Sequence, residues 1–159
     1  MMAAQIFSAP VSDRYLEDYK VGARFEFGPI DVEEAEIIAF SERFDPQTMH
    51  TDPVKAKKGR YAGLIASGWH TLALMMRLFV DNYLSSIASH ASPGVNEVRW
   101  LHPVRPGDRL FLRVGVLDVR SSRSKPDRGV IVSFVEGVNQ DGTVVCSFEA
   151  INLMQKRHP

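Results

Sequence analysis

The sequence contains very little cysteine: Cys146 is the only thiol among 159 residues. A single thiol forms neither an intramolecular disulfide nor a paired-cysteine metal site. Cys146 follows two valines in an apolar run, where a buried and inert thiol is expected rather than a nucleophile.

The sequence also lacks an excess of charge of either sign. Nineteen Lys and Arg residues balance nineteen Asp and Glu residues, which argues against nucleic acid or an anionic membrane as the main partner. A local basic patch for a small anionic ligand is still compatible with this balance. For each basic cluster a solvated surface is the default interpretation and phosphate contact the alternative. The clusters are Lys57, Lys58 and Arg60, and Arg120, Arg123, Lys125 and Arg128.

No apolar run is long enough to predict a membrane span. Residues 64–80 come closest, but they include Ser67, His70 and Arg77 and fall short of the roughly 20 apolar residues required. A helix buried by its own protein explains this run better. Residues 1–10 lack a basic start and a sustained apolar stretch, so we expect an unstructured lead-in, no signal peptide and a cytoplasmic protein.

Length and composition indicate one globular domain. Hydrophobic residues make up 45% and charged residues 24% of the chain, which is typical of folded proteins. No internal repeat or long linker divides the sequence. We therefore expect a single domain over residues 1–159, with its core at about residues 21–153.

The first half of the chain predicts a strand followed by helices. Residues 23–30 alternate and end at a Gly-Pro pair, which indicates a strand. Asp31 is expected to cap the next helix, with Glu34 completing a capping box. This helix is expected to end at Phe44, because the following residue precedes a proline.

Two further helices are expected. Pro53 suits the first position of a short helix, with Asp52 or Thr51 before it. Residues 45–52 would then form a loop held between two helices. An apolar helix is expected from residue 68 to about residue 84.

The second half of the chain predicts a β-sheet. Its β-rich runs are separated by turn signals, including Pro106-Gly107-Asp108 and Asp141-Gly142, which indicates an antiparallel meander. The connection over residues 103–110 is similarly short. A single sheet that covers one apolar helix curls around it, so the fold class is α+β. The runs cover residues 95–103, 110–119, 130–138 and 143–153.

Asp45 and His50 are candidate catalytic residues. A carboxylate and an imidazole five positions apart, between prolines, can converge on one water molecule. Proton transfer at neutral pH favours histidine assisted by a carboxylate. The alternative is that Asp45 ends a helix and that His50 is a surface or packing residue.

The start of the apolar helix is a second candidate site. Gly68 would present free backbone N–H groups and the positive end of the helix dipole, which suit a carbonyl oxygen that acquires negative charge. The alternative is that Ser67 is an N-cap and Gly68 only permits close packing. Gly63 and Gly68 have P-loop spacing, but Trp69-His70 replaces the required Lys-Ser/Thr, which excludes that type of nucleotide site. His70 is expected to be a hydrogen-bonded core histidine.

Three motifs together are similar to those of one protein family. Residues 45–53 contain an Asp that ends a helix, a His five positions later and then an Asp-Pro pair. An Ile-Ala-x-Gly helix start follows at residues 65–68, and a Pro-Val-x-x-Gly-Asp turn at residues 103–108. In this order and spacing they resemble the MaoC-like dehydratases, which include the R-specific enoyl-CoA hydratases. The resemblance covers about residues 21–153.

Three positions differ from the family pattern. Gln47 replaces the usual Asn, Thr48 the usual Pro, and Phe44 the usual small residue. Asp45 and His50 are intact, so the resemblance implies the family chemistry. The changed surroundings of the pair bear on which acyl group is accepted.

The resemblance implies a hot-dog fold, in which a curved antiparallel sheet wraps around the long central helix. It also implies a homodimer or a dimer of dimers whose sheets join at their edges, with the acyl-pantetheine arm in a tunnel at the interface. The protein would be a hydro-lyase that interconverts 2-enoyl-CoA and 3-hydroxyacyl-CoA without a metal or other cofactor. Asp45 and His50 would be its acid–base pair, and the thioester would be bound by Gly68, Ser67 and Gln47.

Two other functions remain open. Acyl-CoA thioesterases of the same fold also use an acidic residue and a helix N-terminus, but they lack the paired Asp and His. The chain could instead be a non-catalytic acyl-binding subunit. The changes at Gln47 and Thr48 are the only hint of that alternative.

Overall fold

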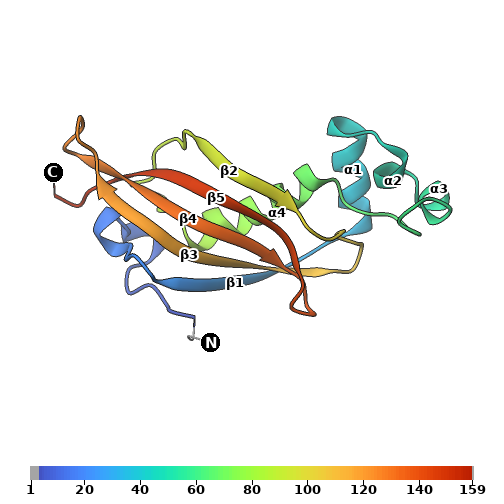
Figure 1. The fold of residues 1–159 in the computed structure, drawn as a ribbon, viewed down its shortest axis with the longest axis horizontal. Coiled ribbons are helices and arrows are strands. Elements are labelled where there is room, and N and C mark those ends of the chain that lie inside the picture. The colour runs from blue at the N-terminus through green and yellow to red at the C-terminus, as the bar shows by residue number, and fades with distance from the viewer. Residues whose placement is uncertain (1–3, 159) are drawn as a thin grey trace.

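The computed structural model describes residues 4–158 and contains a five-stranded antiparallel sheet lying across one long helix (Figure 1). The α+β class and the antiparallel sheet around a central helix are therefore confirmed. The strand order is β1-β3-β4-β5-β2. The strands are β1 (Arg24–Asp31), β2 (Gly94–Trp100), β3 (Arg109–Ser121), β4 (Arg128–Val138) and β5 (Val144–Gln155).

The meander β3-β4-β5 forms the centre of the sheet, as the alternating runs predicted. β2 ends three residues earlier than expected, because the N–H groups of Leu101 and His102 both donate to Val145 O outside the strand ladder. The connection from β2 to β3 is short, yet these strands do not pair. β2 pairs with β5 instead, at the opposite edge from β1, so residues 101–108 cross the end of the sheet.

The central helix α4 (Gly68–Asn82) packs its buried face on the sheet. Gly137 in β4 allows a close approach, because a Cβ at this position would lie 2.8 Å from Met75 Sδ and 2.7 Å from Cys146 Sγ. Cys146 is buried, as expected, and burial raises the pKa of its thiol to about 11. The helix ends two residues before the expected position. Arg14 Nη1 donates to the carbonyls of Asn82 and Tyr83 at this end.

The first helix, α1 (Glu34–Phe44), is not capped as predicted. Glu33 occupies the N-cap position without a side-chain hydrogen bond, and Asp31 is the last residue of β1. The reason is a tertiary contact: Val32 N–H donates to Asp108 O at 2.9 Å, and Val32 O accepts from Gly107 N–H at 2.8 Å. This pairing keeps the backbone extended past Asp31, so the predicted capping box is wrong.

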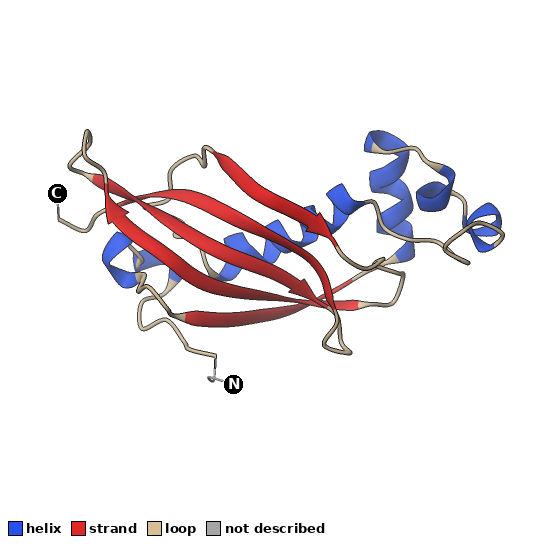
Figure 2. Cartoon of the chain, in the orientation of Figure 1, coloured by secondary structure: helices blue, strands red, loops and turns tan. Residues whose placement is uncertain are grey.

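The segment between Asp45 and Asp52 is not entirely a loop, because it contains a single helical turn, α2 (Thr48–Thr51). The next helix, α3 (Pro53–Lys57), begins at the predicted proline, and Asp52 Oδ1 accepts from Lys55 N–H at 3.0 Å. Figure 2 shows α1, α2 and α3 gathered beyond one end of the sheet, next to the N-terminus of α4.

Residues 4–23 pack on the opposite end of the molecule. They include the 3-10 turns η1 (Val11–Asp13) and η2 (Leu16–Asp18). Phe7 stacks on Phe25 with ring centroids 4.0 Å apart, so the prediction of an unstructured lead-in is wrong for Phe7. Residues 1–3 of that lead-in lie outside the described residues. Within residues 4–158, no helix has the length and apolar character needed to cross a membrane.

Candidate active site

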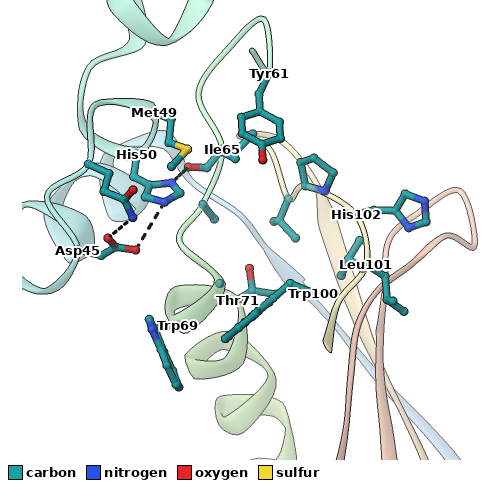
Figure 3. A pocket seen from close by; sticks show the side chains of 16 residues that line it. Asp45, Met49, His50, Tyr61, Ile65, Trp69, Thr71, Trp100, Leu101 and His102 are labelled. Carbon is teal, nitrogen blue, oxygen red and sulfur yellow. Dashed lines mark hydrogen bonds and ion pairs between the residues drawn. The ribbon is translucent and has the colours of Figure 1, made fainter. Parts of the chain in front are cut away.

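Asp45 is placed by the end of α1. Its N–H donates to Ser41 O at 2.9 Å, and its backbone is non-helical (φ −152°, ψ 69°), as expected before Pro46. Gln47 N–H then donates to Asp45 O at 2.7 Å, which turns the chain into α2. The short α2 turn brings His50 back beside the Asp45 carboxylate (Figure 3).

His50 is buried, with 5% of its surface exposed. Its Nδ1 lies 2.8 Å from Ile65 O. Because a carbonyl oxygen only accepts hydrogen bonds, this contact assigns the proton to Nδ1. In the neutral ring Nε2 then carries a free lone pair, and this atom is 3.5 Å from Asp45 Oδ2. The structure thus brings Asp45 and His50 together, with Nε2 directed at the carboxylate.

Two side chains hold the Asp45 carboxylate. Gln47 Nε2 donates to Oδ1 at 2.7 Å, and Ser67 Oγ donates to Oδ2 at 2.7 Å. The hydrogen bonds from Gln47 and Ser67, followed by the proximity of His50, lower the pKa of Asp45. The site therefore favours the ionised carboxylate.

Ser67 has two roles in the structure. Its Oγ accepts from Trp69 N–H at 3.3 Å, so it is the predicted N-cap of α4, and the same oxygen donates to Asp45. Gly68 also fits the close-packing interpretation, since a Cβ there would lie 2.5 Å from the indole of Trp100. At the first position of α4, the Gly68 N–H has no acceptor within the helix. Gly68 therefore combines close packing with a backbone donor that has no acceptor among residues 4–158.

A pocket of about 400 Å³ opens beside these groups, a volume within the range of small-molecule sites. Asp45 and His50 lie on one side, and Thr71 of α4 lies below them (Figure 3). Gln47 and Gly68 also line the pocket. The remaining wall was not expected from the sequence. It is formed by Tyr61, by Trp100 at the end of β2 and by the residues that follow it, including Leu101, His102 and Pro103.

Tyr61 directs its hydroxyl into the pocket (Figure 3). Its loop is held in place: Gly63 N–H donates to Ala56 O at 3.1 Å, and Arg105 Nη2 donates to Tyr61 O at 2.6 Å. Ala62 has a positive φ of 53°, which is uncommon for a residue with a side chain. The two glycines of residues 59–63 were the only sequence signal for this ordered turn.

Trp100 and His102 come from a segment with no recognisable motif. Trp100 packs edge-on against Trp69 with ring centroids 5.3 Å apart. His102 Nδ1 lies 2.9 Å from Val144 O, so its proton is assigned to Nδ1, as in His50. Both residues reach the pocket because β2 pairs with β5, a pairing that the sequence did not predict.

His70 does not line the pocket. It is buried, as expected, and stacks on Phe40 with ring centroids 4.9 Å apart. The predicted hydrogen bond is wrong within the described residues: Nε2 is 3.8 Å from Glu36 Oε2, and Nδ1 has no partner there. Burial lowers the pKa of His70 and favours its neutral form.

Comparison with known sequences identifies the family. The pattern of the MaoC like domain matches residues 18–145. The chain belongs to the MaoC-like family. It is 33% identical to the uncharacterised protein YdeM of Bacillus subtilis over 89% of this chain and 99% of YdeM. It is 30% identical to 3-hydroxyacyl-thioester dehydratase Z of Mycobacterium tuberculosis over 67% of this chain and 71% of that protein.

Solved structures agree with this family assignment. A MaoC-like dehydratase from Rhodospirillum rubrum is 38% identical, covers 92% of this chain and 99% of its own, and has a TM-score of 0.83. A Mycobacterium tuberculosis protein with a double hot-dog fold is 15% identical, with a TM-score of 0.79 over 93% of this chain and 46% of its own. This second likeness concerns the fold alone, and it confirms the hot-dog fold.

Proposed function

We propose that the chain is a hydro-lyase that adds water to a 2-enoyl-CoA thioester and removes it from the 3-hydroxyacyl-CoA. The observation that carries the proposal is the approach of His50 Nε2 to Asp45 Oδ2, 3.5 Å apart at the wall of a pocket. The start of α4 lines the same pocket. The mycobacterial relative named a 3-hydroxyacyl-thioester dehydratase supports the reaction type.

In the proposed mechanism one water molecule donates to both His50 Nε2 and Asp45 Oδ2. During hydration Nε2 takes a proton from this water while the oxygen forms a bond to the β-carbon. The electron pair of the double bond moves toward the thioester, and the imidazolium returns a proton to the α-carbon. Dehydration follows the reverse course. The assigned Nδ1 proton supports His50 as the base, and ionised Asp45 orients the water and stabilises the imidazolium.

The thioester oxygen becomes enolate-like in this reaction. We propose that the Gly68 N–H and the dipole of α4 bind it, as in other sites where negative charge develops. Gln47 and Ser67 were expected to bind substrate. Because both side chains hydrogen-bond to the Asp45 carboxylate, we propose that their main role is to position that carboxylate.

A panel of enoyl-CoA and 3-hydroxyacyl-CoA esters of different chain length and branching tests this function. For the best substrate we expect a change in enoyl absorbance without release of free CoA thiol. Thiol release without hydration would instead support a thioesterase. Binding without either reaction would support the acyl-binding subunit and contradict the proposed activity.

We also propose that two copies associate through β2 and α4. β2 is an edge strand, paired only with β5 among the described strands, and unpaired edges favour strand addition. Trp69, Met76 and Val80 form an exposed apolar stripe on α4. Light scattering should give the mass of a dimer, or of four chains for a dimer of dimers. A Met76→Glu variant with unchanged mass would contradict this interface.

Cytoplasmic location and the lack of a cofactor stay predictions.

A further inference from the structure

The two basic clusters of the sequence lie at opposite ends of the molecule. Lys57 ends α3, and Lys58 and Arg60 follow it, beside the segment that carries Tyr61 into the pocket. Arg120, Arg123 and Lys125 belong to the β3–β4 hairpin, at the far end of the sheet in Figure 1. Only the first cluster adjoins a residue that lines the pocket, because Arg60 precedes Tyr61, whereas no hairpin residue lines it.

The two clusters also differ in how their charge is compensated. On the hairpin, two of the four basic side chains are paired, Arg120 with Asp118 and Arg128 with Asp127 at 2.8 Å, while Arg123 and Lys125 have no ion pair within residues 4–158. Beside the pocket, the side chains of Lys57, Lys58 and Arg60 are exposed and make no ion pair or hydrogen bond within residues 4–158. The nearby Asp52 is already paired with Lys55, at 3.3 Å. Three positive charges within four residues are thus left uncompensated in a chain of zero net charge.

Backbone hydrogen bonds order the turn that joins the cluster to the pocket. Ala62 N–H donates to Gly59 O at 3.0 Å, and Gly63 N–H donates to Ala56 O, so the turn after Arg60 is folded back on α3. Arg105 reaches this turn from the β2–β3 connection. Within residues 4–158 its guanidinium makes one hydrogen bond, to Tyr61 O, and the side chain is exposed. Arg105 adds a fourth positive group beside Tyr61.

We infer that Lys57, Lys58, Arg60 and Arg105 bind the phosphate groups of coenzyme A, and that the acyl carrier is CoA itself. This inference rests on the proposed acyl-CoA function. CoA carries its phosphates at the far end of the extended pantetheine arm. A thioester held beside Asp45 and His50 therefore leaves the phosphates outside the pocket, at its rim. A compact cluster of basic side chains suits phosphate oxygens, whereas an acyl carrier protein presents acidic groups over a wider surface.

Binding of CoA and of 3′,5′-ADP, measured by titration calorimetry, tests the inference without requiring turnover. The test variant is Lys57→Gln/Lys58→Gln/Arg60→Gln, and the matched control is Arg120→Gln/Arg123→Gln/Lys125→Gln. We expect the test variant to bind both probes about tenfold more weakly, the scale for the loss of three exposed charge contacts. The control should bind like the wild type. The affinity of the test variant should also depend less on salt.

The outcomes separate this inference from the proposed reaction. A wild-type protein that binds CoA through this cluster but hydrates no enoyl-CoA would support the phosphate site and contradict the hydro-lyase. Equal affinities of the test variant and the wild type, or equal losses in both triple variants, would overturn the site. So would a variant that loses activity only on thioesters of an acyl carrier protein. Melting temperatures equal to that of the wild type establish that the variants fold.

Discussion

The two ends of α4 both contain buried polar side chains, but they satisfy them differently. At its C-terminus, Tyr19 Oη donates to Tyr83 O at 2.7 Å, and Tyr83 Oη shares a 2.7 Å hydrogen bond with Ser133 Oγ. Arg14 donates to Tyr83 O at 2.9 Å. Burial raises the pKa of both tyrosines and lowers that of Arg14. This end is closed, and its polar groups bond to one another.

At the N-terminus of α4, about 20 Å away for a helix of this length, the polar groups line a pocket instead. Asp45 is held by Gln47 and Ser67, and the partner of His50 Nε2 is the carboxylate at 3.5 Å. A water or substrate can contact these atoms. Polar groups that are enclosed and hydrogen-bonded to one another stabilise the fold, whereas polar groups that face a cavity are available for chemistry.

Asp45→Asn, at the N-terminal end of α4, is expected to have the largest effect on activity. The amide preserves the size of the side chain but removes the charge that orients the water and stabilises the imidazolium. We expect hydration to fall at least about a hundredfold, the usual scale for lost acid–base catalysis. Enoyl absorbance assays measure it, and Asp118→Asn on the hairpin end is the control. A near-normal rate for Asp45→Asn would show that the carboxylate has no catalytic role.

The corresponding change at the closed end is Arg14→Ala. It removes hydrogen bonds to Ala9, Asn82 and Tyr83 carbonyls and the stacking of the guanidinium on Phe7, 3.6 Å from the ring centroid. The free energy of unfolding should fall by about 2–3 kcal/mol, because buried acceptors lose a charged donor. Urea denaturation measures this loss, and the activity of the folded protein should be unchanged. A variant that keeps its stability but loses activity would contradict the claim that this end of α4 serves stability and not the reaction.

Ser67→Ala should change the pH dependence of the reaction. Ser67 helps to lower the pKa of Asp45, so its removal raises that pKa toward the ordinary value. The rate requires the carboxylate, and it falls as pH drops through this pKa. In the proposed mechanism the base His50 must be unprotonated as well, so the ionisation of Asp45 sets only the lowest-pH part of the acid limb. That part should move to higher pH, with a rate loss of about tenfold for one hydrogen bond to a charged group.

Ser85→Ala is the matched control for Ser67→Ala. Ser85 Oγ accepts from Ala88 N–H at 2.9 Å just beyond the other end of α4. Both substitutions remove a serine that accepts a backbone N–H, at a cost of about 1 kcal/mol in stability. Only Ser67→Ala should shift the acid limb. A shift of equal size in both variants would mean that the effect is one of stability.

The smallest effect is expected from Tyr83→Phe. It leaves the buried hydroxyl of Ser133 without its 2.7 Å partner and should lower the free energy of unfolding by about 1–2 kcal/mol. Urea denaturation is again the measurement, with Tyr15→Phe as the control, because Tyr15 is half-buried and its hydroxyl donates no hydrogen bond within residues 4–158. No loss of stability would mean that a water takes over the bond and that this end is less enclosed than the structure indicates.

Much of this architecture was predictable from local signals. The strand runs, the proline at the start of α3 and Ser67-Gly68 at the start of α4 each depend on neighbours in sequence. The predicted cap at Asp31 was wrong because Val32 pairs with the turn at Gly107 and Asp108, a contact between distant segments. A single turn such as α2 has no periodicity to detect.

The site was predictable to the same extent. Asp45, His50, Ser67 and Gln47 lie in or beside short motifs, and the structure brings all four together. The roles assigned to them stay predictions. Tyr61 was missed because its placement depends on a left-handed Ala62 and on Arg105, and the wall at residues 100–103 depends on which strand β2 pairs with.

The most direct test of a shared water is a double-mutant cycle of Asp45→Asn and His50→Ala, measured as kcat/KM for the best enoyl thioester. If both side chains act on one water molecule, the double variant should lose no more than about tenfold beyond the more damaged single variant. If each single variant loses about 100-fold and the double variant loses about 10,000-fold, the two effects multiply. Asp45 and His50 would then act independently, which contradicts the shared water.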